Sequence, residues 1–398
     1  MKTPTAAPAA KVILGSLRQE TQERMASFTA DLAELVAQDS GSGYASGIRR
    51  IADFFEKRLR SLGAEVLRVP VGYPSIPDLG DVVIATFTGT GTSRTILCGH
   101  MDTVFGEGEA AARPLSVDAA GIANGPGVSD DKGGALAGLY ALEALAARGL
   151  DSYGTVAFVL VPDEEIGSPG SQKVVRELAA TMTQALCLEC ARENGDLVIA
   201  RKGVADLVFT VEGRAAHAGI EPERGASAAI TAAGLALDLQ VLAESWTDVT
   251  LNVGVMNAGT QPNVVAASAT IVADLRASDP SHFEAAIEQA RMLAQASRVP
   301  GTATTMEVSQ PAIPWSTRRG DAELAARAQQ LALALDFRVG TASTGGSADA
   351  NHLSAIVPAV LDGLGPVGGN DHSEAEWLDL RTVPDRAALL AALILDPC

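Results

Sequence analysis

The chain has 398 residues, of which 47% are hydrophobic and 20% charged, a composition that excludes a disordered chain. Its 48 acidic and 30 basic residues give a formal net charge of -18, which excludes nucleic acid and anionic membrane surfaces as expected partners. The length predicts two domains, because single cores stop growing near ~250 to 300 residues.

No segment of the sequence predicts a membrane span or a secretion signal. Apolar stretches such as 225–237 end at a charge before the roughly 18 to 20 residues that a span requires. Lys11 and two prolines interrupt the N-terminal segment where a signal peptide is apolar. We therefore expect a cytoplasmic protein with reduced cysteines. Cys187 and Cys190 have CxxC spacing, but the sequence has no second pair to complete a four-sulfur zinc site.

The first half of the chain alternates between helical and strand periodicity. Helices are expected over 22–37, 47–62, 133–148 and 171–181, and strands over 64–70, 81–88, 94–98, 155–161 and 184–188. We expect 81–88 and 94–98 to pair around the Gly/Thr turn at 89–92. Apolar strands alternating with amphipathic helices predict an α/β fold with a sheet covered on both faces.

The order of elements changes after Val204. Strand, helix, strand, strand, helix and strand are expected over 205–212, 226–242, 250–257, 268–277, 281–296 and 302–308. This is the βαββαβ order of a ferredoxin-like module. A helix, a strand and a helix of the first type follow over 321–335, 355–362 and 384–395. We therefore predict one α/β domain, formed by 1–203 and 313–398, that is interrupted by an inserted domain at 204–312.

Histidine and acidic residues recur where predicted strands end. His100 follows an apolar strand, and Asp102 lies on the same face, where its carboxylate can orient the imidazole for metal ligation. A solvated turn is the alternative for this His-x-Asp motif taken alone. The turn GPGVSDDKGG at 125–134 places Asp130 and Asp131 before a helix. An N-cap is the alternative role of these two aspartates.

Further acids follow the strand that ends at Val161. Glu164 and Glu165, in PDEEIGS, are costly at a buried strand end unless cations neutralise them, and a solvated charge run is the alternative. Glu189 and His372 also follow predicted strands or lie in Gly-rich turns. Taken together, these histidines and acids form a set of N and O ligands suited to two zinc-like ions.

With these motifs the sequence resembles the dinuclear zinc peptidases and aminoacylases, a family that includes bacterial glutamate carboxypeptidase and succinyl-diaminopimelate desuccinylase. HMDTV, GPGVSDDKGG, PDEEIGS, the isolated Glu189, RAAHAG and DGLGPVGGNDHSEAEWL match the blocks of the family in order and spacing. The resemblance covers nearly the whole chain and is greatest to the glutamate carboxypeptidase branch. It implies a catalytic domain with a central mixed sheet and an inserted ferredoxin-like domain that serves as a dimerisation or lid domain.

The resemblance also implies a ligand set for two divalent ions, Zn2+ or alternatively Co2+ or Mn2+. Asp130 would bridge the ions, with His100 and Glu189 completing one site and Glu165 and His372 the other.

Further roles follow from the same resemblance. Glu164 would be the general base. The catalytic role expected of Asp102, which is to orient His100, rests on its position two residues after His100 and not on the resemblance. The family has a cis peptide after the bridging aspartate, here between Asp130 and Asp131. His217, in the inserted domain, would reach the active site of the partner subunit and stabilise the oxyanion, so that a homodimer is the catalytic unit.

Two residues match substrate-binding positions of relatives, and two others depart from the pattern of the family. Asn263, in GTQPN, and Arg276, in VADLR, match positions that hold substrate, with Arg276 as the clamp for an α-carboxylate. A turn residue and a surface ion pair are their alternative roles. Gln310 stands where glutamate-cleaving relatives carry arginine, and Cys190 stands where relatives usually carry proline.

We expect a hydrolase that cleaves the amide bond of an N-acyl amino acid or peptide and releases a C-terminal amino acid. An aminopeptidase or dipeptidase on the same metal core is the alternative. A non-catalytic binding protein would be expected to have lost a ligand or the base, and all are present. The GxGxxG pattern at 363–368 is typical of dinucleotide sites. Because no helix is expected directly after it, we do not expect a nucleotide-binding site there.

Overall fold

The structure is a computed structural model that describes residues 8–395 and divides into two compact units. Unit 1 contains the chain up to Ile199, Thr317–Ser343 and the chain from Ala348 onward, and unit 2 contains Ala200–Ser316 and Thr344–Ser347. The inserted domain predicted at 204–312 falls within unit 2. Among the described residues, no helix is both long and apolar enough to cross a membrane.

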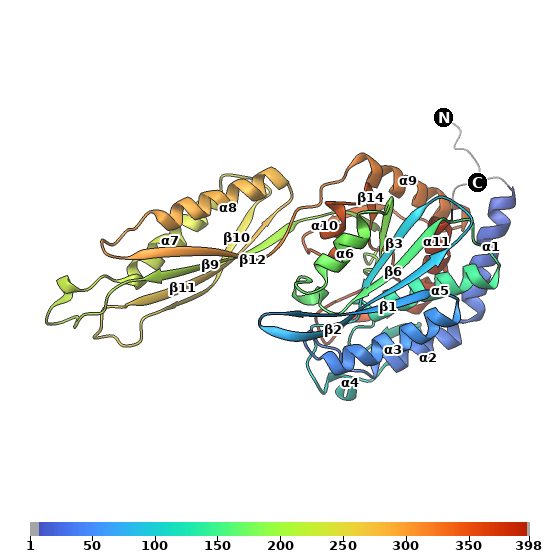
Figure 1. Cartoon of the computed structure of the whole chain (residues 1–398), viewed down its shortest axis with the longest axis horizontal. Coiled ribbons are helices and arrows are strands. Elements are labelled where there is room, and N and C mark those ends of the chain that lie inside the picture. The colour runs from blue at the N-terminus through green and yellow to red at the C-terminus, as the bar shows by residue number, and fades with distance from the viewer. Residues whose placement is uncertain (1–7, 396–398) are drawn as a thin grey trace. The chain divides into compact units, whose positions relative to one another are not determined.

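Unit 1 is built on a six-stranded mixed sheet with the strand order β1-β2-β6-β3-β7-β14 (Figure 1). The strands are β1 (Glu65–Tyr73), β2 (Ile76–Thr88), β3 (Arg94–His100), β6 (Thr155–Val161), β7 (Gln184–Cys187) and β14 (Ala359–Leu361). β6, β3, β7 and β14 run parallel, whereas β1 and β2 are antiparallel to their neighbours. The predicted α/β fold with a mixed sheet is confirmed.

The predicted hairpin of 81–88 and 94–98 is wrong, because β6 lies between β2 and β3 and pairs with both. The Gly/Thr turn at 89–92 bonds instead to the loop that leads into β6. The N–H groups of Gly89 and Gly91 donate to the carbonyl oxygens of Gly154 and Tyr153 at 2.9 and 2.8 Å. The turn therefore carries the chain past an intervening strand.

Helices surround the sheet of unit 1 (Figure 1). They are α1 (Pro8–Glu23), α2 (Met25–Val36), α3 (Ala45–Ser61), α4 (Glu109–Ala112), α5 (Lys132–Ala147), α6 (Gln172–Ala179), α9 (Arg319–Ala334), α10 (Asp349–Ser354) and α11 (Val383–Ile394). α5 is buried at every position from Lys132 to Leu145, because it packs against α1, α2, α11 and β3 at once. This burial fixes the turn that precedes α5.

Two small sheets join distant segments. β4 (Ser116–Val117), β5 (Ile122–Asn124), β15 (Gly368–Gly369) and β16 (Trp377–Asp379) form one sheet with the order β15-β16-β5-β4. The pairing of β16 with β5 brings the C-terminal motif 368–379 beside the turn that precedes α5. β8 (Leu197–Arg201) pairs with β13 (Thr341–Thr344).

Unit 2 has its own sheet and its own core. Its elements are β9 (Gly203–Glu212), α7 (Ala228–Ala243), β10 (Thr250–Ala258), β11 (Ser268–Ala277), α8 (Pro280–Gln295) and β12 (Ala303–Ala312). The four strands are antiparallel in the order β10-β11-β9-β12, and both helices pack against them. Alternate residues of β9 are buried, as expected for a sheet with one covered face.

Candidate metal centre

Acids and a histidine of unit 1 gather at one edge of the six-stranded sheet. His100 is the last residue of β3, Glu164 and Glu165 follow β6, and Glu189 follows β7. These three strands are neighbours and parallel, so their carboxyl ends meet at the same edge. Asp130 reaches the edge from the turn before α5.

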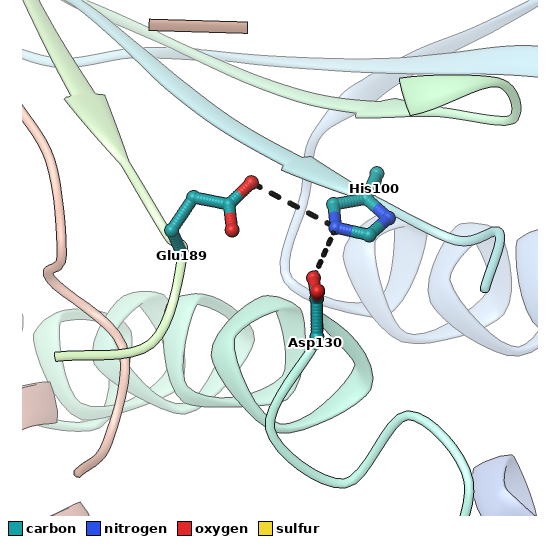
Figure 2. Close-up of side chains that lie close together, drawn as sticks. All are labelled: His100, Asp130 and Glu189. Atoms are coloured by element: carbon teal, nitrogen blue, oxygen red, sulfur yellow. Dashed lines mark hydrogen bonds and ion pairs between the residues drawn. The ribbon is translucent and has the colours of Figure 1, made fainter. Parts of the chain in front are cut away.

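Figure 2 shows the first group of candidate ligands, His100, Asp130 and Glu189. His100 Nε2 lies 2.9 Å from Asp130 Oδ1 and 3.8 Å from Glu189 Oε1. The imidazole of His100 is only 1% exposed. One ligand atom from each residue lies within 4.8 Å of the other two.

The second group consists of Asp130, Glu165 and His372, whose ligand atoms also lie within 4.8 Å of one another. His372 Nε2 lies 3.1 Å from Asp130 Oδ2 and 2.9 Å from Glu165 Oε2. The two oxygens of Asp130 therefore face two different histidines. The structure brings together all five residues that were predicted as ligands, with Asp130 common to both groups.

The donor set fits divalent cations. Burial disfavours the charged form of His100, but hydrogen bonds to Asp102 and Asp130 outweigh it and raise the pKa of His100 well above its usual value. Hydrogen bonds to Asp130 and Glu165 raise the pKa of His372 to about 10. The carboxylates that raise the pKa values of these two imidazoles create a negative electrostatic potential around them. Such a potential favours a bound cation.

Asp102 is buried and has a different main contact from the one predicted. Nδ1 of His100 lies 3.0 Å from the main-chain carbonyl oxygen of Asp102 and 3.4 Å from its carboxylate. The carboxylate accepts hydrogen bonds from the N–H groups of Glu164 and Glu165, each at 3.1 Å, and from the Ser42 hydroxyl at 2.7 Å. Asp102 therefore ties His100 to the segment that follows β6.

Glu164 opens a short 3-10 helix, Glu164–Ile166, and belongs to neither of the two ligand groups found among the described residues. Burial, and then the negative charge of Glu189, raise the pKa of Glu164 well above its usual value. A carboxylate beside the ligands that is not itself a ligand is suited to proton transfer.

The peptide between Asp130 and Asp131 is cis, as the resemblance implies. Asp131 occupies the N-cap position of α5, but its side chain makes no capping hydrogen bond. Its Oδ2 instead accepts a hydrogen bond from the main-chain N–H of His100 at 3.3 Å. The N-cap alternative therefore describes the position of Asp131 and not the function of its carboxylate.

Glu376 is a site residue that the sequence did not single out. Its buried carboxylate accepts hydrogen bonds from the N–H groups of Gly127, Ser129 and Asp130 at 2.9, 2.8 and 3.1 Å. Burial raises the pKa of Glu376 to about 7. The only sequence signal was its place in the block that contains His372.

Lys132 holds the same turn from the other side. Its buried ammonium group donates to the carbonyl oxygens of Gln38 and Pro126 at 2.9 and 3.3 Å. Burial lowers the pKa of Lys132 to about 8. The turn that carries Asp130 is thus fixed by a carboxylate on its N–H groups and by a cation on its carbonyl oxygen.

The remaining predicted site residues belong to unit 2, and their roles at the metal centre stay predictions. His217 is exposed and forms a bridge with Val264, which places it beside the turn of Asn263. Arg276 is ion-paired with Asp274 at 2.9 Å, as its alternative role implied. Gln310 lies in β12, and its side chain is outside the described part of the structure.

Residues 96–396 match the peptidase family M20/M25/M40. The chain is 30% identical over 383 residues to carboxypeptidase G2 of Pseudomonas sp. (strain RS-16), an alignment that covers 96% of this chain and 91% of that protein. It is 29% identical over 276 residues to succinyl-diaminopimelate desuccinylase of Burkholderia vietnamiensis, covering 65% and 70%. The structure is similar to that of aminopeptidase PepT from Bacillus cereus, with a TM-score of 0.76, 25% identity and coverage of 94% and 98%.

Proposed function

Because the chain belongs to the peptidase family M20/M25/M40 and is a metal-dependent hydrolase, we propose that it cleaves N-acyl amino acids or peptides and releases a C-terminal amino acid. The observation that carries this proposal is the pair of ligand groups that share Asp130. The alignment with a carboxypeptidase over 96% of the chain supports cleavage at the C-terminal side of the substrate.

Two divalent ions, Zn2+ or alternatively Co2+ or Mn2+, are proposed to occupy the two groups. His100, Asp130 and Glu189 would hold one, and Asp130, Glu165 and His372 the other. Imidazole nitrogens and carboxylate oxygens are common zinc ligands. When bound, the ions lower the pKa of a water molecule and polarise the scissile carbonyl.

The chain's own groups would supply the proton transfer and the oxyanion contact. Glu164 takes a proton from the attacking water and returns it to the leaving amine. Asp102 holds Glu164 in place through the main-chain N–H of that residue. His217, contributed by the partner subunit, donates to the developing oxyanion.

Unit 2 is proposed to be a ferredoxin-like dimerisation and lid domain. Its element order and its strand order β10-β11-β9-β12 support this assignment. The solvent face of α7 carries an apolar stripe in which Ile230, Leu237 and Val241 are 62%, 70% and 64% exposed. An apolar stripe of this kind is suited to pairing with a second copy of the chain.

The substrate α-carboxylate is proposed to bind Arg276. Nε and Nη2 of Arg276 donate to Asp274 at 2.9 and 3.0 Å, and Nη1 donates to the Gly345 carbonyl at 2.9 Å. These bonds orient the guanidinium and leave a second N–H on each terminal nitrogen for a carboxylate. Asn263, whose turn adjoins His217, would contact the same substrate.

An aminopeptidase or dipeptidase on the same metal core is the second candidate. The structural similarity to aminopeptidase PepT favours it. In addition, Asp274 partly neutralises Arg276, which weakens its attraction for a substrate carboxylate.

A substrate pair distinguishes the proposed carboxypeptidase activity from the aminopeptidase activity. One compound, an N-benzoyl amino acid, has a blocked amine and a free carboxylate, and the other, an amino acid anilide, has a free amine and no carboxylate. With zinc present, the proposed function predicts hydrolysis of the first compound only. Hydrolysis of the anilide alone would establish the aminopeptidase instead.

A further inference from the structure

One carboxylate joins three of the segments that carry the proposed ligands. Asp371 Oδ1 accepts a hydrogen bond from the Ser129 hydroxyl at 2.8 Å, and Oδ2 accepts one from the Cys190 thiol at 3.4 Å. Each of these three residues is the chain neighbour of a different ligand, respectively His372, Asp130 and Glu189.

The two side chains that donate to Asp371 are buried, so the loss of these hydrogen bonds would affect the local structure. Ser129 and Cys190 are buried, and a buried polar group that loses its partner destabilises the local structure. On either side of Asp371, Asn370 and His372 have φ angles of 57° and 62°. Asparagine and histidine adopt such left-handed conformations more often than most residues, so these angles fit a tight turn around Asp371. The hydrogen bonds from Ser129 and Cys190 tie this turn to the segments of Asp130 and Glu189.

We infer that Asp371 is a positioning residue that holds the segments of Asp130, Glu189 and His372 in register, and that the Cys190 thiol is its donor from the Glu189 segment. The inference rests on the proposed function, because it concerns the same ligands.

Zinc affinity, measured by competition with a chromogenic chelator, tests the inference directly. Asp371→Ala is expected to bind zinc about 10- to 100-fold more weakly than wild type, the usual effect of losing a group that orients ligands. Asp118→Ala is the matched control. Asp118 also fixes a loop, by accepting from the N–H groups of Ala120 and Ile122 at 2.8 and 2.9 Å, but that loop carries no ligand. The control is expected to bind zinc like wild type.

The Cys190 variants separate the hydrogen bond from packing. Cys190→Ala should weaken zinc binding and alter the visible spectrum of the Co2+-substituted protein, whereas Cys190→Ser should restore both, since a hydroxyl also donates to Asp371. The comparison of Cys190→Ala with Cys190→Ser tests the inference even if Asp371→Ala does not fold. The double variant Ser129→Ala with Asp371→Ala should bind zinc no more weakly than Asp371→Ala alone.

Two results would overturn the inference, namely zinc binding by Asp371→Ala equal to that of wild type, or Cys190→Ser binding as weakly as Cys190→Ala. Wild-type protein that binds no zinc would overturn the proposed function together with the inference. Wild-type protein that binds zinc while the variants bind it equally well would overturn the inference alone.

Discussion

Asp130 connects the two halves of the candidate site, since one of its oxygens faces His100 and the other faces His372. Burial opposes its negative charge, but hydrogen bonds from both histidines lower the pKa of Asp130 below its usual value. The lowered pKa keeps the carboxylate ionised, with one oxygen toward each histidine. Its position depends on Glu376, which fixes the N–H groups of the turn.

Glu164→Gln tests the general base. The amide cannot accept a proton from water, so kcat is expected to fall by at least ~10² to 10⁴-fold. Both metals should remain bound, because Glu164 belongs to neither ligand group of the described residues. Metal content and kcat are measured on the same sample. Near-normal turnover would show that another group is the base.

Gln310 leads to a prediction about substrate choice. The resemblance assigns Gln310 to substrate binding; a glutamate leaving group would bury a second carboxylate there, and a neutral glutamine would not neutralise its charge. We expect kcat/KM for N-benzoyl leucine or phenylalanine to exceed that for N-benzoyl glutamate by roughly tenfold or more. A preference for glutamate would show that another cation replaces the arginine.

Residue types and strand ends were sufficient to predict the residues of the two candidate ligand groups, but not the residues that hold these groups in place. His100 and Glu189 could be recognised because each follows an apolar strand. Glu376 and Asp371 lie in a loop that the pairing of β16 with β5 brings beside the turn before α5. No local sequence pattern indicates that pairing. The carbonyl oxygen of Asp102, which lies nearer to His100 than its carboxylate, is likewise invisible in a sequence.

At the level of elements, the positions of strands in the sequence were predicted better than the pairing of strands in the sheet. The strand 155–161 was predicted with the bounds that β6 has. The false hairpin of β2 and β3 arose because a short Gly-rich connection usually joins antiparallel neighbours. α10 was missed because it is short and all its residues, Asp349–Ser354, are buried, so that it shows no amphipathic periodicity.

The GxGxxG segment packs against the Glu189 segment and against α11. The N–H of Gly365 donates to the carbonyl oxygen of Glu189 at 3.0 Å. The buried guanidinium of Arg386, on α11, donates to the carbonyl oxygens of Gly363 and Gly365. Close approach to the Glu189 segment explains the absence of a side chain at Gly365, where a Cβ would collide with the main chain of that segment.

The contact of α10 with α6 predicts a pH dependence of stability. Burial, and then the positive charge of Arg176, lower the pKa of His352 from 6.5 to about 4. The unfolded chain therefore binds a proton that the folded protein does not bind between these pH values. The free energy of unfolding is therefore not reduced by His352 above pH 6.5. It decreases as the pH falls from 6.5 toward 4, by about 3 kcal/mol in total for a pKa shift of this size.

His352→Gln tests this prediction, because the other titrating groups of the site, such as Asp349, are common to both proteins. Free energies of unfolding in urea are measured at pH 7 and pH 5. Wild type is expected to lose more stability than the variant between these two values. An equally steep loss in the variant would mean that His352 does not carry the effect.

At the scale of the whole molecule, the length predicted two domains and the order of elements predicted an inserted one, and the structure divides the chain into two units. The segment Thr344–Ser347, which is counted with unit 2, had no signal in the sequence, because its assignment depends on contacts with distant residues. Its Thr344 carbonyl, for example, accepts a hydrogen bond from the N–H of Lys202 at 3.0 Å. The homodimer and the cytoplasmic location stay predictions.

Complementation tests the proposed dimer. His217→Ala and Glu164→Gln are each expected to be inactive. A mixed dimer contains one intact site, which combines Glu164 of one chain with His217 of the other, so exchange of subunits should restore activity. Native mass spectrometry establishes that heterodimers form. Heterodimers without activity would show that His217 does not act across the interface.

The metal content of the protein tests the central claim, that Asp130 joins two metal sites. After reconstitution with zinc and removal of unbound ions, mass spectrometry of the elements is expected to find two ions per chain in wild type, one for each ligand group. Asp130→Ala should lose both ions, whereas Asp118→Ala should keep both. Fewer than one ion per chain in the wild-type protein, or full occupancy in Asp130→Ala, would contradict the account.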